Sequence, residues 1–432
     1  MSTEKKNYSL PIAMMFALFF MISFVTGLPS PMGVIVAKQF GASNFESQLG
    51  FLANFLAYAF MGIPAGIMLK KIGYKKTALA AILVGFAGVG VQYLSGVFGS
   101  FSIYLTGAFI AGFSMCMLNT VVNPMLNTLG GGGNSGNKLL QFGGSINSIG
   151  ATITPMLVGY LMGAAAGRTI EKANPALFIA MGIFALAFVV LFFVEIPEPH
   201  MQTASERKVK HSHSPLSFRH FILGAIAIFI YVGIEIGIPS TANLFMTASS
   251  TVGTHLGLGI DATTAGFVVG IYWLLMLVGR LTGGAIGSKV SSKTMLITVS
   301  SLGLLFILLA IFSPITTTVS MPVFKSDLSF GITEVPISIM FLVLCGLCTS
   351  IMWGGIFNLA VEGLGKYTAA AAGIFMVMVS GGGIVPLIQG FVSDHFGYLN
   401  SYWVMFICLA YMLFYGLIGS KNVNKDIPVD NI

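Results

Sequence analysis

Charged residues are scarce in this sequence: Asp, Glu, Lys and Arg make up 8% of its 432 residues, against roughly 25% in an ordinary soluble protein. Apolar residues make up 56%, and the mean hydropathy is +0.90. A soluble chain of this length divides into domains with polar surfaces, so the composition excludes a water-soluble globule. The excess apolar surface must face lipid. A spanning helix needs about 20 apolar residues, so the length allows about a dozen spans with short connections.

Cysteine is scarce as well, and all four cysteines lie inside apolar runs, which argues against a disulfide framework. Cys345 and Cys348 form a C-x-x-C pair without a second ligand pair, so we interpret them as small packing residues and expect no metal site. The sequence also lacks H-E-x-x-H, G-x-S-x-G and G-x-x-x-x-G-K-[ST], and its apolar runs hold no paired carboxylates. We therefore predict no enzymatic activity, no ATP-driven pumping and no bound cofactor.

Twelve apolar runs are long enough to span a bilayer, and a polar, proline-containing stretch separates the first six from the last six. We predict an all-α membrane protein with an N-terminal six-helix bundle over 1–196, a cytoplasmic linker over 197–219 and a C-terminal six-helix bundle over 220–432. The runs lie near 11–37, 46–69, 77–97, 101–126, 139–165 and 174–195, and near 220–247, 262–287, 293–313, 335–361, 368–393 and 398–419.

Basic residues alternate with these runs in a pattern that sets the topology. With the N-terminus inside, sixteen Lys and Arg fall in predicted inner segments and four in outer segments. Positive residues favour the cytoplasmic side, so the count predicts twelve alternating spans with both termini in the cytoplasm. The net charge of +7 is distributed between apolar runs rather than along one exposed face, so we expect no nucleic-acid partner.

Two residue patterns recur across the linker at constant offsets, which indicates two related halves enclosing a central site. The sequence offset is the same for all three residues of a pattern but differs between the two patterns, as insertions in the loops between them would produce. The recurring sets are Gly66, Lys71 and Lys75 with Gly284, Lys289 and Lys293, at an offset of 218, and Gly150, Pro155 and Gly159 with Gly381, Pro386 and Gly390, at an offset of 231.

Ionisable groups at membrane depth are costly, so each one is a functional hypothesis. Glu235 lies about fifteen residues into its predicted span, or roughly 22 Å along a helix, which is near the midplane. Arg280 lies closer to the inner end of the next span. Structural pairing, anchoring toward the inner surface and substrate contact remain open for Arg280.

Amide side chains at depth offer both donors and acceptors, which suits a neutral polyhydroxyl ligand better than an ion or a lipid. Interhelical hydrogen bonds are the alternative for each of them. A tryptophan can stack on the apolar face of a sugar or simply pack, and prolines in spans can break helices beside a cavity or only kink them. The candidate substrate residues are Asn119, Asn123, Gln141, Asn147, Asn243, Asn358 and Trp353, with Pro29, Pro31, Pro124, Pro155, Pro239 and Pro386 as predicted breakers.

Several stretches resemble the fucose/glucose–galactose branch of the major facilitator superfamily, the sugar:proton symporters, over nearly the whole length. The resemblance implies a monomeric alternating-access carrier for a hexose or deoxyhexose in a bacterial cytoplasmic membrane, with Lys70, Lys71, Arg280, Pro155 and Pro386 in gating or structural roles. The stretches are Ala65 to Lys75, where Lys70 replaces the acid usual in the wider superfamily, Asn123-Pro124, Gln141 to Pro155, Tyr231 to Glu235, Gly279-Arg280, Ile356 to Lys366 and Gly381 to Gly390.

The chain departs from the fucose symporters where those proteins carry proton-coupling acids. Ser30 and Asn119 stand in these places, and neither side chain titrates in the physiological range. Glu235 is the remaining deep carboxylate. It can exchange a proton, bind Na⁺ together with neighbouring oxygens, or hydrogen-bond the sugar in an uncoupled facilitator. We predict proton or sodium coupling through Glu235, with facilitation as the alternative.

The sequence thus predicts a secondary transporter for a neutral sugar such as fucose, glucose or galactose, working by alternating access. A carrier for another small polar solute, such as a nucleoside or a drug-like molecule, is the alternative within transport. A membrane sugar sensor on the same fold, which binds without transporting, is the alternative from another class.

Overall fold

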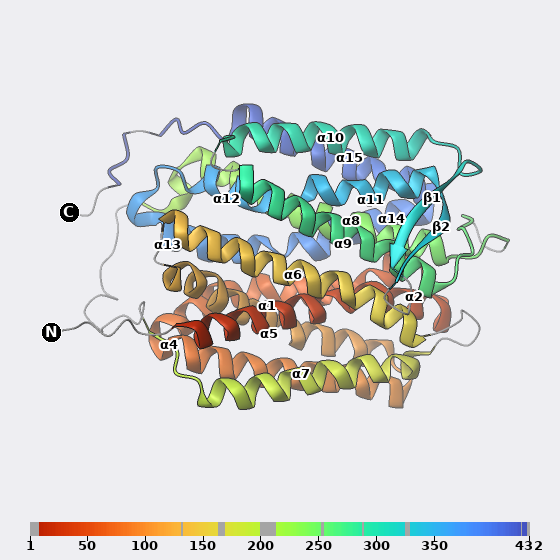
Figure 1. The fold of residues 1–432 in the computed structure, drawn as a ribbon, viewed down its shortest axis with the longest axis horizontal. Helices are drawn as coiled ribbons and strands as arrows, with labels where there is room; N and C mark the ends of the chain where they lie inside the picture. The colour runs from red at the N-terminus through yellow and green to blue at the C-terminus, as the bar shows by residue number, and fades with distance from the viewer. Residues whose placement is uncertain are drawn as a thin grey trace.

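The computed structural model describes residues 8–130, 133–162, 169–198, 213–251, 255–286, 289–324, 329–424 and 426–429. Its long helices run nearly side by side along one axis (Figure 1). The described chain starts and ends at one end of the molecule, the terminal end, and a β-hairpin marks the opposite end, the hairpin end. Helices α1 to α7 lie together in the lower part of Figure 1, and α8 to α15 lie in the upper part.

The first half contains α1 (Ser9–Gly27), α2 (Pro29–Gln39), α3 (Asn44–Ser47), α4 (Leu49–Phe98), α5 (Phe101–Leu129), α6 (Gly133–Met162), the 3₁₀ helix η1 (Ile170–Ala173) and α7 (Asn174–Phe193). The second half contains η3 (Pro215–Ser217), α8 (Arg219–Thr247), α9 (Ala262–Ile286), α10 (Ser292–Phe312), β1 (Thr318–Phe324), β2 (Phe330–Pro336), α11 (Ile337–Thr349), α12 (Met352–Val361), η4 (Gly365–Tyr367), α13 (Thr368–Met378), α14 (Gly381–Phe396), α15 (Tyr398–Phe414) and the π-helical turn η5 (Tyr415–Gly419).

Ten helical stretches of the described residues are long and apolar enough to cross a bilayer, and α4 accounts for two crossings. Its 50 residues would span about 75 Å as one straight helix. Gly73 interrupts it with φ of 85°. Asn54 donates to the carbonyl of Ala108 at 3.2 Å, while a Cβ on Gly88 would lie 2.5 Å from the amide nitrogen of Ala111. Because both arms contact the same turn of α5, the chain folds back at Gly73.

Helix α6 supplies a further crossing. It is 30 residues long, or about 45 Å, and it packs between α1 of its own half and α9 of the other half. Ten stretches, the second arm of α4 and α6 together give twelve crossings, consistent with the twelve predicted spans. The protein is a multi-pass membrane protein, and the predicted helical membrane fold is confirmed apart from the hairpin described below.

The predicted internal repeat is visible in how equivalent glycines pack within each half. A Cβ on Gly150 of α6 would lie 2.9 Å from the carbonyl oxygen of Phe20 in α1. A Cβ on Gly381 of α14 would overlap the carbonyl oxygen of Phe229 in α8. The fifth crossing therefore packs closely on the first, and the eleventh packs in the same way on the seventh.

A second pair of equivalent glycines forms contacts between the halves. A Cβ on Gly159 of α6 would lie 2.9 Å from the carbonyl oxygen of Ala262, the first residue of α9. A Cβ on Gly390 of α14 would lie 2.8 Å from the carbonyl oxygen of Asn44, the first residue of α3. Each half thus places a glycine against the start of an element in the other half, as a two-fold pseudo-symmetric arrangement requires.

Three crossings are interrupted along their length. The break between α1 and α2 falls at Leu28, before Pro29, because prolines remove backbone donors. The breaks between α11 and α12 and between α13 and α14 contain no proline. Pro155 and Pro386 lie inside α6 and α14, as Pro124 and Pro239 lie inside α5 and α8, so the prediction that these four prolines break their helices was wrong. Transmembrane helices tolerate proline when neighbouring groups satisfy the freed backbone.

Among the described residues, the hairpin is the one feature that departs from an all-α fold. Strands β1 and β2 pair antiparallel from Thr318 opposite Pro336 to Phe324 opposite Phe330. Met321, Val323 and Val335 are buried on one face. Residues 314–334 lie between two predicted spans, so the prediction of helical runs gives them only as a connection. The alternation of buried and exposed residues with period two is the signal that marks them.

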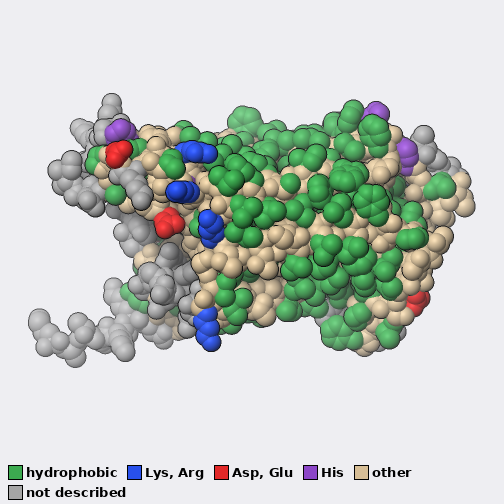
Figure 2. Space-filling model, turned by 90° about the horizontal axis from the view of Figure 1, so that it is seen from above, with side chains coloured by type: hydrophobic (Ala, Val, Ile, Leu, Met, Phe, Trp, Pro, Cys, Tyr) green, Lys and Arg blue, Asp and Glu red, His purple; other side chains and the backbone are tan. Residues whose placement is uncertain are grey.

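Basic side chains are distributed unevenly over the surface. In the face shown in Figure 2, Lys and Arg gather toward the terminal end, and a broad hydrophobic region covers the rest of the molecule's length. The described basic residues at that end lie at the bend of α4 (Lys70, Lys71, Lys75 and Lys76), at the start of α8 (Arg219), before and within the start of α10 (Lys289 and Lys293) and after η5 (Lys421). Most of the predicted linker lies outside the described residues.

Candidate functional site

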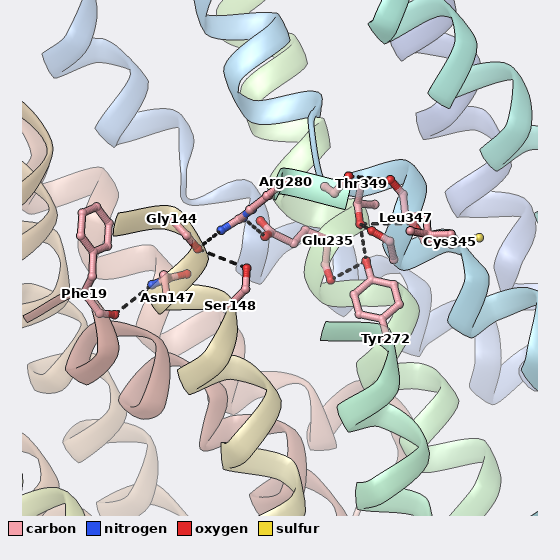
Figure 3. Close-up of polar contacts among 12 residues, drawn as sticks. Phe19, Gly144, Asn147, Ser148, Glu235, Tyr272, Arg280, Cys345, Leu347 and Thr349 are labelled. Atoms are coloured by element: carbon pink, nitrogen blue, oxygen red, sulfur yellow. Dashed lines mark hydrogen bonds and ion pairs between the residues drawn. The ribbon is translucent and has the colours of Figure 1, made fainter. Parts of the chain in front are cut away.

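An ion pair lies on the seam between the two halves. Arg280 of α9 donates from Nη2 to Oε1 of Glu235 in α8 at 3.3 Å. Its Nη1 donates to the backbone carbonyl of Gly144 in α6 at 2.8 Å. Figure 3 shows the guanidinium between the two partners. The side chains of Arg280 and Glu235 are 13% and 15% exposed. One cation therefore contacts both halves of the protein at a site that is largely shielded from the surface.

The position of this pair follows from helix geometry. Glu235 lies about 24 Å from the start of α8 and about 18 Å from its end, so it is close to mid-depth. Arg280 lies about 9 Å from the end of α9. Side chains on a helix tilt toward its N-terminus, which in α9 is the hairpin end. The arginine therefore extends toward Glu235 and forms an interhelical pair, which favours structural pairing over anchoring at the surface.

Aromatic and hydroxyl groups surround Glu235 on the second-half side. The Tyr231 hydroxyl, one helical turn earlier, is buried and lies near both charged groups. The centroid of the Tyr231 ring lies 6.2 Å from that of the Trp353 ring in α12. Tyr272 donates to the backbone carbonyl of Glu235 at 3.2 Å, and its hydroxyl is 3.0 Å from that of Thr349. Thr349 ends α11, so the broken tenth crossing is tied to the site.

Two of the predicted amides form a cluster in the first half. The Nδ2 of Asn119 in α5 donates to the Tyr58 hydroxyl at 3.0 Å and to the Met115 carbonyl at 3.1 Å. Asn123 donates to the backbone carbonyl of Asn119 at 2.8 Å. All three side chains thus form one network on the α4–α5 side of the seam. Tyr58 was not among the predicted site residues, because its hydroxyl carries no distinguishing sequence pattern.

Asn147 lies nearer to the ion pair. It follows Gly144 by three residues in α6, so the two residues share a face of the helix. Its Nδ2 donates to the backbone carbonyl of Phe19 in α1 at 3.1 Å. In Figure 3 Asn147 projects from α6, and the guanidinium of Arg280 reaches Gly144 on the same helix from α9. The fifth crossing therefore links the first crossing to the charged pair.

The remaining predicted residues are not gathered at this point. Asn243 is buried nearer the hairpin end, where its Nδ2 donates to the Ser30 hydroxyl of α2 at 3.4 Å. Asn358 is exposed on α12. The side chain of Gln141 lies outside the described residues. Lys70 and Lys71 are exposed at the terminal end of the first arm of α4, far along the helix from the seam.

One surface cavity lies away from the charged pair. A cavity of about 460 Å³ opens at the terminal end, where Ile72, Lys75 and Lys76 of α4 face Glu195 and Glu198. It is separate from the charged pair. Within the described part of the chain, no three His, Cys, Asp or Glu side chains are grouped closely enough to hold a metal ion. All four cysteines are buried and unbridged.

Two related bundles of membrane helices with a polar seam between them are the architecture of a secondary transporter. The chain belongs to the major facilitator superfamily, because the model of the family described as "Major Facilitator Superfamily" matches residues 15–386. The membership inferred from sequence motifs is confirmed.

Named relatives cover almost the whole chain. A glucose/galactose transporter of Brucella abortus is 28% identical over 425 residues, which is 98% of this chain and 97% of the relative. The L-fucose-proton symporter of Escherichia coli is 22% identical over 450 residues, covering 98% and 96%. The crystal structure of FucP in its outward conformation matches with a TM-score of 0.67 and 21% identity, covering 96% of this chain and all of that one. These relatives are named as sugar transporters of the kinds that the sequence resembles.

Proposed function

We propose that this protein is a secondary transporter that carries a neutral sugar, a hexose or deoxyhexose, across the bacterial cytoplasmic membrane by alternating access. It acts as a monomeric carrier rather than as an enzyme, with both termini in the cytoplasm. The names of the relatives support the sugar class, because glucose, galactose and fucose are all neutral and rich in hydroxyl groups. The basic residues at the terminal end support the orientation.

The charged pair on the seam carries this proposal. Glu235 and Arg280 are oppositely charged and 3.3 Å apart, so their charges cancel and the site does not favour an ionic solute. An ionised carboxylate only accepts hydrogen bonds, and a guanidinium only donates them. Together with the amides of Asn119 and Asn147, the pair presents both kinds of partner, which suits a sugar hydroxyl.

Arg280 also links sugar binding to the relative movement of the two bundles. It is bonded to Glu235 of its own half and to Gly144 of the other half, so opening the seam requires at least one of these bonds to change. A sugar hydroxyl that displaces Arg280 from either partner alters the contact between the bundles. The interrupted first, tenth and eleventh crossings provide the points at which helices can bend.

Radiolabelled galactose, glucose and fucose uptake into proteoliposomes tests the sugar class. Saturable uptake of one of them, competed by the unlabelled sugar, supports the proposal. Saturable binding to the detergent-purified protein without uptake supports a sensor on the same fold. Uptake of a nucleoside in place of every sugar supports the carrier for another polar solute.

We further propose that Glu235 couples transport to protons or sodium. Ser30 and Asn119 occupy the places of the family's acids, and Glu235 is a mid-depth carboxylate paired with a cation whose position depends on its charge. Binding of a proton or Na⁺ to Glu235 weakens the ion pair between Glu235 and Arg280, whereas the hydrogen bond from Arg280 to Gly144 remains. The charge at Glu235 therefore controls the bridge between the bundles.

Concentrative uptake under imposed proton and sodium gradients tests coupling separately from substrate class. Wild type accumulates sugar under one of the two gradients, whereas Glu235→Gln equilibrates sugar without accumulating it. Glu171→Gln, the same chemical change at an exposed acid of η1, serves as the matched substitution. If Glu235→Gln accumulates as much sugar as wild type does, Glu235 is not the coupling residue. If wild-type transport is the same with and without each gradient, the protein is a facilitator.

A further inference from the structure

The hairpin end of the seam is closed by a carboxylate contact between the halves. Oδ1 of Asp394, near the end of α14, accepts the backbone N–H of Asn44 at 2.7 Å. Its Oδ2 accepts the N–H of Phe45 at 2.8 Å. Both donors belong to α3, the short helix between the first and second crossings. The contact is bidentate and charge-assisted, which makes it stronger than a neutral hydrogen bond.

The first turn of α3 explains why these donors are available. The first four N–H groups of a helix have no partner within it. Ser43 and Glu46 form a capping box, in which each side chain accepts the other's backbone N–H. That leaves the N–H groups of Asn44 and Phe45, and Asp394 accepts both. The helix is therefore fully capped only when the second half is in contact with it.

Other groups strengthen the same contact. Tyr398 donates to Oδ1 of Asn44 at 3.0 Å, and Nδ2 of Asn44 donates to the Ser393 hydroxyl at 3.3 Å. The rings of Phe45 and Phe391 meet edge to face, with their centroids 6.4 Å apart. Gly390 allows the close approach, since a Cβ there would lie 2.8 Å from the Asn44 carbonyl oxygen.

The other polar contacts across this end of the seam are weaker. Gln48 donates to the Ser240 hydroxyl at 3.4 Å, Asn243 to the Ser30 hydroxyl at 3.4 Å, and Thr263 to the Gly159 carbonyl at 3.2 Å. All three pairs are neutral, and all three distances exceed those of the Asp394 contacts. Asp394 is therefore the group whose loss changes this closure most.

We propose that Asp394 is the latch of the outer gate, where the outer gate is the contact between α3 and α14 at the hairpin end. The Asp394 carboxylate binds α3 while the carrier faces inward, and the two hydrogen bonds break when the carrier opens outward. The inference rests on the proposed alternating access, because the first half's α3 and the second half's α14 must separate to admit a solute from the outside. A carrier without the latch favours the outward-open state.

Spin labels on either side of the gate test this proposal. Phe40→Cys after α2 and Phe396→Cys at the end of α14 place labels on opposite halves, and both positions are exposed. The four native cysteines are buried, which favours labelling at the introduced sites. In nanodiscs without sugar, Asp394→Asn raises the ratio of long to short label distances about tenfold over the parent, which corresponds to about 1.4 kcal/mol.

Three further variants locate the effect. Glu46→Gln removes a carboxylate of the same helix, one that accepts the N–H of Ser43 within the first half, so it leaves the distance ratio within about twofold. Asn44→Ala removes the contacts of the side chain with Tyr398 and Ser393. Asn44→Pro also removes the N–H that Asp394 accepts, at the first helical position, where proline is favoured. Asn44→Pro therefore opens the gate further than Asn44→Ala does.

A distance ratio that stays unchanged in Asp394→Asn overturns the latch. A shift in Glu46→Gln as large as that in Asp394→Asn also overturns it, because the effect would then come from the folding of α3. An Asn44→Pro variant no more open than Asn44→Ala also contradicts it. These measurements use no sugar, so they separate the latch from the substrate. A working latch in a protein that carries no sugar overturns the proposed function alone, and sugar transport with an unaltered gate in Asp394→Asn overturns the latch alone.

Discussion

Removing both members of the Glu235–Arg280 pair should cost less than the sum of the two single losses. At 3.3 Å, the gross attraction of two unit charges is about 5 kcal/mol for an effective dielectric constant of 20. Desolvation of both groups offsets much of this attraction, yet deleting one partner leaves the other buried and unpaired, at about 3–5 kcal/mol. The distance exceeds the 2.7–2.9 Å of a strong charged hydrogen bond, so we expect the low end, about 3 kcal/mol for each single variant.

A double-mutant cycle measures the pair itself. Glu235→Gln, Arg280→Gln and the double variant are compared by equilibrium unfolding in mixed micelles. The double variant should lose about 4 kcal/mol instead of the roughly 6 kcal/mol that the two single losses sum to, so the interaction energy is about 2 kcal/mol. The Gly144 carbonyl loses its donor in both variants that lack Arg280, so that loss cancels within the cycle. Additivity within about 0.5 kcal/mol would show that the two side chains do not interact, and would refute the pairing.

Three other substitutions follow from contacts in and beside the seam. Asn119→Ala should weaken sugar binding roughly 5- to 150-fold, because it leaves hydroxyls unpaired at a cost of about 1–3 kcal/mol; unchanged affinity by calorimetry would mean that Asn119 only packs against Tyr58. Gly159→Val should destabilise the protein by about 1–3 kcal/mol, since a Cβ would lie 2.9 Å from the Ala262 carbonyl, and a wild-type unfolding midpoint would contradict the tight contact. Tyr272→Phe should cost about 1 kcal/mol by the same unfolding assay, and no loss would mean that its bond to the Glu235 backbone contributes nothing.

Much of the fold could be predicted because its signals are local. Apolar run lengths gave the crossings, and the spacing of Gly150, Gly159, Gly381 and Gly390 gave the two related halves that the packing shows. The hairpin was missed because its strands are short and lie between long helical runs. The breaks after Thr349 and Met378 were missed because neither has a proline to mark it, and packing against neighbouring helices decides them.

The site could be predicted only in part. The depth of Glu235 and Arg280 follows from counting residues, but their pairing depends on how α8 and α9 are rotated against each other. Gly144 takes part through its backbone carbonyl, which no side-chain pattern signals. Asp394 lies at the end of an apolar run, where the sequence indicates only a surface acid. Its contact with the first turn of α3 depends on the tertiary structure.

Entrance counterflow tests the central claim, that this protein carries a neutral hexose or deoxyhexose across the bilayer. Proteoliposomes are loaded with unlabelled galactose, glucose or fucose and diluted into a trace of the same labelled sugar, without any ion gradient. We expect a transient accumulation of label above its equilibrium level for at least one sugar, because a carrier exchanges internal for external substrate. Label that never exceeds the level of protein-free liposomes for any of the three sugars would contradict it.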